Sequence, residues 1–151
     1  MKKTCFLVIL LVILSGCSEK EGRQKIEGSL VERIIDGDTL ALANGEKVRL
    51  VGINAPEKNE PCWEEAKKRL EELVLGKSVL LKRDVSDRDK YGRLVRMVYS
   101  EGKLVNLILV EEGLALSFEF EPDTSLLEEF QEAEAISSRA GGCIWKIGAV
   151  E

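Results

Sequence analysis

A short acidic motif, Asp36-Gly37-Asp38-Thr39, lies between two runs of β-type residues. Asp36 and Asp38 flank a glycine, so their carboxylates can converge on one hard cation. Calcium suits such a pair, because it accepts oxygen ligands in varied geometry. Taken alone, however, the motif is better explained as an Asp-Gly turn.

Two arginines stand where a phosphate could bind. Arg49 interrupts an apolar strand, so its guanidinium either reaches solvent or points into a cleft toward an anion. The segment Asn54-Ala55-Pro56-Glu57 follows that strand, and Glu57 could orient a water molecule there. Arg93 ends the segment Asp89-Lys90-Tyr91-Gly92-Arg93 and could hold a phosphate with two parallel hydrogen bonds. Alone, the first arginine belongs to a surface ion pair as often as to a site, and the second more ordinarily belongs to a solvated charge run.

The chain of 151 residues contains no histidine. This absence excludes Ser-His-Asp hydrolases, Cys-His proteases, histidine-based ribonucleases and most zinc hydrolases. With 44% apolar and 32% charged residues, the chain has the composition of one soluble globular domain. Because histidine is absent, any acid–base chemistry must be carried out by Asp, Glu, Tyr, Lys or Arg.

The spacing of apolar residues predicts five strands. Three of them are expected within residues 31–53, where Asn44-Gly45 is typical of a type I′ hairpin turn. Two more are expected at residues 78–82 and 94–99, separated by a polar loop.

Three helices are expected between and after these strands. The first covers residues 61–75, with Pro61 in its first turn, and the second covers residues 104–112. A capping box, Ser125-x-x-Glu128, opens the last helix, and Gly141-Gly142 end it. Five strands with a helix after the third predict an α+β fold built on an OB-fold barrel, although a fold alone does not settle function.

Together the three motifs change the interpretation of each one. DGDT, R-x4-NAPE and DKYGR, in this order on an OB-like pattern, closely resemble the staphylococcal nuclease (thermonuclease) family. The resemblance covers residues 30–146 and includes Gly-Leu-Ala at 113–115 and Ile144-Trp145. It implies a calcium-dependent nuclease that hydrolyses phosphodiester bonds with low sequence specificity. The implied substrate is DNA, with RNA left open.

The resemblance also implies a set of metal ligands. Asp38 matches the principal calcium-ligating aspartate of the family, and Asp36 matches a nearby carboxylate of the metal site. Ala55 matches a residue that ligates through its backbone carbonyl. Asn54 stands where the best-known members have a second ligating aspartate, so one negative charge is lost and calcium binding should be weaker.

Catalytic and substrate-binding roles carry over in the same way. Glu57 matches the glutamate that positions or deprotonates the attacking water, and Arg49 and Arg93 match the arginines that bind the scissile phosphate. Lys90 and Tyr91 match residues that contact the terminal phosphate of the nucleotide.

The aromatic wall of the site departs from the family. Phe118 and Phe120 fall where the family carries tyrosines that contact the nucleotide. Their rings could still stack on bases, but the hydroxyl contacts are lost, and Glu119 between them adds repulsion.

The N-terminus predicts export. Lys2 and Lys3 precede an apolar run from Cys5 to Leu14, which is too short to span a bilayer and is typical of a signal peptide. The ending Leu14-Ser15-Gly16-Cys17 resembles a bacterial lipobox, with an ordinary cleaved signal peptide as the alternative. We therefore expect a signal peptide (1–16), a tether lipid-anchored to the cell envelope through Cys17 (17–30) and a monomeric domain (31–151).

Two cysteines remain in the expected mature domain. Cys62 and Cys143 are expected to form a disulfide, because exported proteins usually pair their cysteines. A two-cysteine zinc site is the weaker alternative, since no histidine is present to complete it.

The net charge of −5 is unfavourable for binding a polyanion. It leaves open a catalytically weak or inactive OB-fold lipoprotein that binds nucleic acid without cleaving it, and a purely structural envelope lipoprotein. The joint presence of Asp38, Arg49, Glu57 and Arg93 favours the enzyme, because a binding module has no chemical need for all four.

Overall fold

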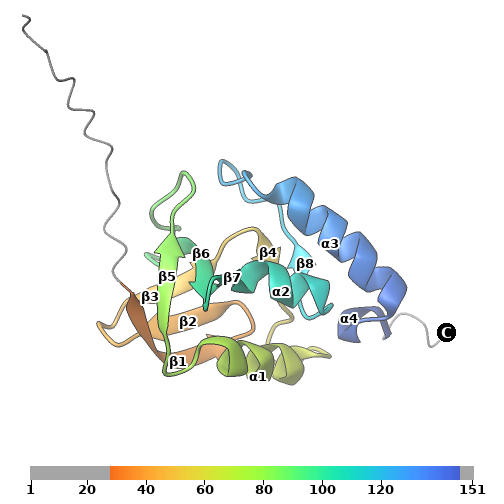
Figure 1. Ribbon diagram of the computed structural model, residues 1–151, viewed down its shortest axis with the longest axis horizontal. Coiled ribbons are helices and arrows are strands. Elements are labelled where there is room, and N and C mark those ends of the chain that lie inside the picture. Colours follow the sequence, from red (N-terminus) through yellow and green to blue (C-terminus); the bar gives the residue numbers. More distant parts are fainter. Residues whose placement is uncertain (1–27, 147–151) are drawn as a thin grey trace, which may run out of the picture.

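The computed structural model describes residues 28–146 (Figure 1). The predicted signal peptide, Cys17 and most of the predicted tether lie outside these residues, as do residues 147–151. In the described part of the chain, no helix has the length and apolar character needed to cross a membrane. The first strand starts at Ser29, so residues 29 and 30, which were predicted to lie in the tether, belong to the domain.

Five strands form a closed barrel: β1 (Ser29–Asp36), β2 (Thr39–Leu42), β3 (Lys47–Leu50), β5 (Ser78–Lys82) and β6 (Leu94–Ser100). β1 pairs with β2 and β5, β2 pairs with β3, and β5 pairs with β6, all in antiparallel orientation. A parallel pairing between β3 and β6 closes the barrel. The predicted five-stranded OB-fold is therefore confirmed.

Three strands of only two residues complete the sheets: β4 (Ile53–Asn54), β7 (Lys103–Leu104) and β8 (Leu116–Ser117). β4 and β8 form a separate antiparallel ribbon in which Asn54 lies opposite Leu116. Gly52, with a φ of 76°, separates β4 from β3, although one continuous strand was predicted there. Such short strands were missed because two residues carry no alternating pattern.

Residues 28–146 contain four helices: α1 (Trp63–Val74), α2 (Val105–Glu111), α3 (Leu127–Ala140) and α4 (Cys143–Lys146). α1 packs on β1 and α2 on β6 of the barrel, whereas α3 packs on α2 and β8. The three predicted helices are confirmed, while α4 is a single turn that was not predicted. α1 begins two residues after Pro61, because Cys62 before it takes a left-handed conformation with a φ of 66°.

The predicted capping box before α3 is wrong. Leu126 is the residue that precedes the helix, and its side chain makes no capping hydrogen bond. The backbone N–H of Ser125 donates to Oδ2 of Asp84 at 3.0 Å, so a distant loop takes the donor that Glu128 would have bound.

The predicted type I′ turn is also wrong. The N–H of Gly45 donates to the carbonyl of Leu42 at 2.9 Å, and the N–H of Leu42 donates to the carbonyl of Glu46 at 2.9 Å. Gly45 has a φ of 87°, whereas Asn44 does not adopt a positive φ. The connection is therefore a three-residue loop with glycine in the left-handed position.

Aliphatic side chains fill the barrel, and one polar side chain lies among them. Asn106 of α2 is fully buried. Its Oδ1 accepts a hydrogen bond from Val98 N–H at 2.9 Å, and its Nδ2 donates to the carbonyl of Val51 at 2.8 Å.

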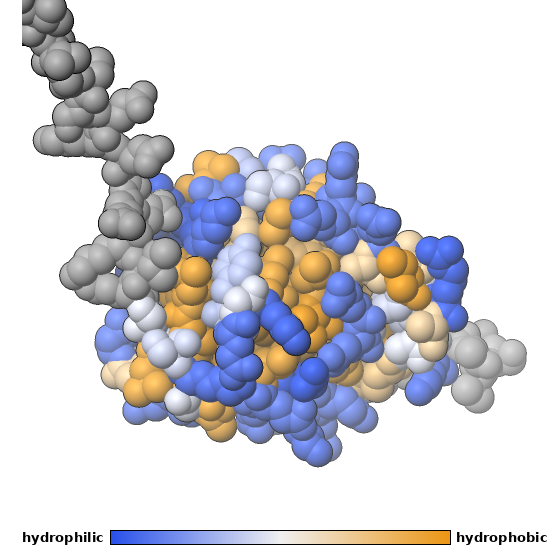
Figure 2. Space-filling view, in the orientation of Figure 1, coloured by the Kyte–Doolittle hydropathy of each residue, from blue (hydrophilic) through white to orange (hydrophobic). Residues whose placement is uncertain are grey.

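Figure 2 shows apolar side chains gathered around α2 at the centre of the visible face, within a largely hydrophilic surround.

Cys62 and Cys143 form a disulfide bond, with their Cα atoms 6.0 Å apart. The bond joins the start of α1 to α4, which lies beside that end of the helix in Figure 1. The prediction of a disulfide is borne out, and the two sulfurs are not available for the alternative zinc site.

Replacing both cysteines with serine (Cys62→Ser/Cys143→Ser) should lower the free energy of unfolding by about 2–4 kcal/mol, because the bond closes a long loop in the unfolded chain. Urea denaturation without reductant measures this difference. Wild-type protein treated with reductant should lose a similar amount. Equal midpoints for the oxidised wild type and the double variant would contradict the expectation.

Candidate active site

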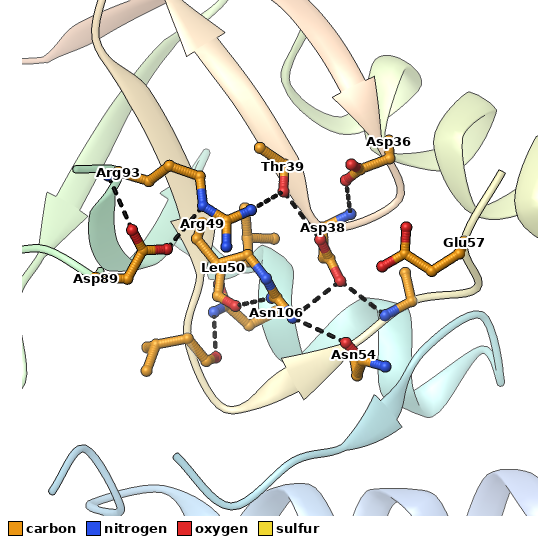
Figure 3. A network of polar contacts seen from close by, with 12 residues as sticks. Asp36, Asp38, Thr39, Arg49, Leu50, Asn54, Glu57, Asp89, Arg93 and Asn106 are labelled. Carbon is orange, nitrogen blue, oxygen red and sulfur yellow. Dashed lines mark hydrogen bonds and ion pairs between the residues drawn. The ribbon is translucent and has the colours of Figure 1, made fainter. Parts of the chain in front are cut away.

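The carboxylate of Asp38 lies at the centre of the candidate site (Figure 3). Its residue occupies the tight turn between β1 and β2 and is only 6% exposed. Oδ2 accepts a hydrogen bond from Ala55 N–H at 2.8 Å and lies 3.1 Å from Nη2 of Arg49. Oδ1 accepts a hydrogen bond from the hydroxyl of Thr39 at 3.0 Å. Protein groups rather than bulk water therefore surround this charge.

Burial raises the pKa of Asp38 to about 6, because desolvation outweighs the opposing effects of Arg49 and the Ala55 N–H. Burial likewise lowers the pKa of Arg49, although Asp38 opposes that shift. The pKa of Asp38 in the folded state thus lies above its unfolded value of about 4. Ionisation of Asp38 therefore lowers the stability of the cation-free fold as the pH rises from about 4 to about 6. A cation beside Asp38 would offset this cost.

Gly37 allows the acidic turn to sit against the rest of the domain. A Cβ atom at this position would lie 2.7 Å from Cβ of Ala55 and 2.8 Å from Cβ of Ala66 in α1. Carbon atoms do not approach so closely, so a larger residue would push the turn away from both neighbours. The glycine of the DGDT motif is thus required by packing, and the N–H of Asp38 after it donates to Oδ1 of Asp36 at 3.2 Å.

Arg49 of β3 holds several of the predicted site groups together. Its Nη2 lies against Asp38 and also donates to Oδ1 of Asn54 at 3.0 Å, while its Nη1 donates to the carbonyl of Leu50 at 2.5 Å. Asn54 consequently lies on the side of Asp38 opposite Asp36 (Figure 3). The predicted ligands Asp38 and Asn54 are brought together, but a guanidinium contacts both of them.

Arg93 is fixed beside the same turn by the loop that precedes it. Its Nε donates to Oδ2 of Asp89 at 2.7 Å, and its backbone N–H donates to Oδ1 of Asp89 at 3.0 Å. Nη1 lies 3.5 Å from the hydroxyl of Thr39. Burial raises the pKa of Asp89, but the hydrogen bonds from Arg93 outweigh it and hold that pKa below its ordinary value. Asp89 therefore remains a carboxylate that orients Arg93.

Glu57 lies in a turn that its neighbour Glu60 closes. The N–H of Glu57 donates to Oε2 of Glu60 at 2.7 Å, and the N–H of Glu60 donates to the carbonyl of Glu57 at 2.9 Å. These two bonds fix the main chain, while the side chain of Glu57 is exposed. In Figure 3 its carboxylate faces that of Asp38.

The predicted aromatic residues lie near the arginines. Phe118 and Phe120, whose ring centres are 6.5 Å apart, line a cavity of about 160 Å³ together with Arg49 and Arg93. Tyr91 is 72% exposed, and its ring centre lies 5.3 Å from Cζ of Arg93. Nζ of Lys90 lies 5.1 Å from the same ring centre, so the DKYGR segment forms one edge of the site.

Three residues of the site were not predicted: Thr39, Glu60 and Asp89. Thr39 and Asp89 lie inside the DGDT and DKYGR motifs, so their positions were marked by the sequence even though their roles were not. Glu60 lies outside the motifs, and no sequence pattern pointed to it.

The residues around Asp38 fit a hard cation, because they offer oxygen atoms and no sulfur or imidazole. Figure 3 shows Asp36, Asp38 and Glu57 bordering the same space. Within residues 28–146, no group of three or more Asp, Glu or Cys residues is arranged to hold a metal ion by itself. A cation on Asp38 would therefore need amide or carbonyl oxygens and water as further ligands, which calcium accepts.

Comparisons with known proteins show the family of this chain. The family described as "Staphylococcal nuclease homologue" matches residues 47–147. Endonuclease YncB of Bacillus subtilis is 37% identical over 144 residues, which cover 87% of this chain and 67% of that protein. The SPbeta prophage-derived endonuclease YokF of the same organism is 36% identical over 76% of this chain, which spans only 43% of that protein. Thermonuclease of Staphylococcus intermedius is 29% identical over 80% of this chain and 77% of its own length. This chain therefore belongs to the staphylococcal nuclease family of hydrolytic nucleases.

Proposed function

We propose that this protein is a calcium-dependent nuclease that hydrolyses phosphodiester bonds of DNA, and of RNA as a second substrate class, with low sequence specificity. One observation carries the proposal: the Glu57 carboxylate borders the space beside Asp38, while Arg49 and Arg93 line an adjoining cavity. These groups suit the hydrolysis of an anionic ester: one carboxylate can act as a general base, another can bind a cation, and two guanidiniums can bind the phosphate.

The two arginines would bind the scissile phosphate. A guanidinium presents a planar set of donors that matches phosphate oxygens, and it stays charged at neutral pH. The side chain of Arg93 is held at Nε by Asp89, so its terminal nitrogens can face the substrate. As the reaction proceeds, charge builds up on the phosphate oxygens, and donors already in place stabilise it.

Staphylococcal nuclease-like enzymes use a metal ion, and we infer that calcium serves here. Asp38 and Asp36 would hold it through their carboxylates, Ala55 through its carbonyl oxygen and Asn54 through its amide oxygen. When bound, calcium would supply positive charge to the phosphate oxygens in the transition state. Its positive charge would also offset the desolvation of Asp38.

Glu57 would accept a proton from the attacking water. Water is a poor nucleophile, so a carboxylate within hydrogen-bond reach assists it as a general base. The turn closed by Glu60 keeps the main chain of Glu57 in place during this transfer.

Low sequence specificity follows from the kinds of contact available. Contacts to phosphate carry no sequence information, and aromatic stacking accepts every base. The positive surface is local, because Arg88 pairs with Glu46 at 2.8 Å and Arg96 pairs with Asp87 at 2.6 Å. We therefore expect binding to be strongest where the arginines of the site reach the strand.

The proposed setting is the bacterial cell envelope, with a monomer lipid-anchored through Cys17. The signal-like residues 1–16 support export, although they and Cys17 lie outside the described residues. The Cys62–Cys143 bond suits an oxidising compartment. Membrane fractionation of wild-type and Cys17→Ser cells tests the anchor, and an unchanged membrane-bound fraction would count against it.

Glu57→Gln and Arg93→Lys should each lower kcat on single-stranded DNA by about 10²–10³-fold, because each removes one group that acts in the transition state. Cleavage is measured with calcium and with a chelator. Glu111→Gln, an exposed change at the end of α2, is the matched control and should retain full activity. Cleavage at the wild-type rate in the chelator, or by Glu57→Gln, would contradict the mechanism. DNA binding without any cleavage would support the non-catalytic OB-fold module instead.

Asn54→Asp should lower the calcium concentration needed for half-maximal activity, because it restores a charged ligand next to Asp38. The calcium midpoints of wild type and variant are compared at one substrate concentration. The exposed change Asn59→Asp in the following turn adds the same charge away from Asp38 and serves as the control. Equal midpoints for Asn54→Asp and wild type would rule out Asn54 as a ligand position.

A further inference from the structure

A second cavity of about 400 Å³ adjoins the site at Asn54. Its volume falls within the range of roughly 300–1,000 Å³ typical of small-molecule sites. It shares Asn54 and Ala55 with the proposed metal ligands, but none of the roles described above uses its apolar walls. Its lining consists of Asn54, Ala55, Pro56, Glu60, Pro61, Leu116 and Ile144.

Both cavities lie along the β4–β8 ribbon. Asn54 lines both of them and pairs with Leu116, which lines the second cavity. Phe118, two residues after Leu116, lines the first. Phe118 follows the last residue of β8, and its N–H donates to the carbonyl of Gly52 at 2.9 Å. Two residues of extended chain span roughly 7 Å. An extended nucleic-acid strand on this ribbon can therefore reach both cavities from a phosphate held near Asn54.

The chemistry of the second cavity favours a nucleobase over a phosphate. Pro56, Pro61, Leu116 and Ile144 give it apolar walls against which a flat ring can pack. The charged group in its lining is the carboxylate of Glu60, which repels phosphate and accepts hydrogen bonds. Adenine, cytosine and guanine can donate to such an acceptor through an exocyclic amino group, whereas thymine and uracil can donate only through their ring N3–H.

The walls of the cavity are anchored before any ligand arrives. Ile144 follows Cys143, Pro61 precedes Cys62, and the disulfide joins these two cysteines. The N–H of Ile144 also donates to the carbonyl of Gly113 at 3.1 Å. A cavity with fixed walls loses little conformational freedom when a ligand binds.

We propose that this cavity binds the nucleobase on the far side of the scissile phosphate from the base at Phe118 and Phe120, with a modest preference for bases that carry an amino group. The inference rests on the proposed nuclease function and names a second substrate subsite for it. Contacts to phosphate still supply most of the affinity for the strand. The preference for an amino-bearing base is therefore limited to one position beside the scissile phosphate.

The test uses single strands with one cleavable phosphodiester, whose neighbouring links are replaced by methylphosphonates. The residue on each side of that bond is in turn deoxyadenosine, thymidine or an abasic deoxyribose. In the wild-type protein, removing the base on either side should lower kcat/KM about tenfold, as expected for the loss of one stacked base. Ile144→Trp fills the second cavity and should abolish this tenfold effect of base removal on one side of the cleavable bond. Phe118→Ala should abolish the effect on the other side.

The control is Ile136→Trp, at an exposed position of α3. This variant should keep the effect of base removal on both sides of the bond. Glu60→Gln should reduce the preference for deoxyadenosine over thymidine on the side that responds to Ile144→Trp. Equal effects of Ile144→Trp on substrates with and without the base would overturn the subsite while leaving the nuclease proposal intact. Absence of cleavage by the wild-type protein would instead overturn the proposed function, and the subsite with it.

Discussion

The site is organised around one buried charge, the carboxylate of Asp38. The barrel places it in a turn too tight for any residue but glycine at position 37, between Ala55 and α1. Desolvation of this group is costly, and its contacts with Arg49 and the Ala55 N–H compensate only in part, as its raised pKa indicates. These partners lie around a single carboxylate because the barrel closes, the turn at Gly37 is tight and the chain after β4 passes beside that turn.

This constraint explains why an arginine lies among the proposed metal ligands. Arg49 contacts Asp38 and Asn54 and acts as the local counter-charge. The proposed calcium ion would add positive charge beside Asp38, and the phosphate of the substrate would attract Arg49. Both would weaken the ion pair between Arg49 and Asp38. Binding of metal and substrate would then depend on each other through one guanidinium.

Much of this arrangement could be predicted from the sequence. The three polar motifs lie in or beside strands that the spacing of apolar residues predicts, and the order of strands and helices fits an OB-fold. Other features depend on contacts between distant segments, which local patterns do not encode. Ser125 fails to cap α3 because Asp84 takes its N–H, and Asn54 turns toward Arg49 rather than toward Asp36. Glu60 holds the turn of Glu57 although nothing in its sequence neighbourhood distinguishes it from other surface glutamates.

The most direct test of the central claim is the thermal unfolding midpoint of wild-type protein and of Asp38→Asn, each with and without calcium. Asparagine keeps an acceptor for the Ala55 N–H but removes the charge that a cation would neutralise. At about 100 times the dissociation constant, calcium should stabilise the wild-type fold by about 2.7 kcal/mol and raise its midpoint by several degrees. The midpoint of Asp38→Asn should not change. An equal rise in both proteins, or no rise in the wild type, would contradict the account.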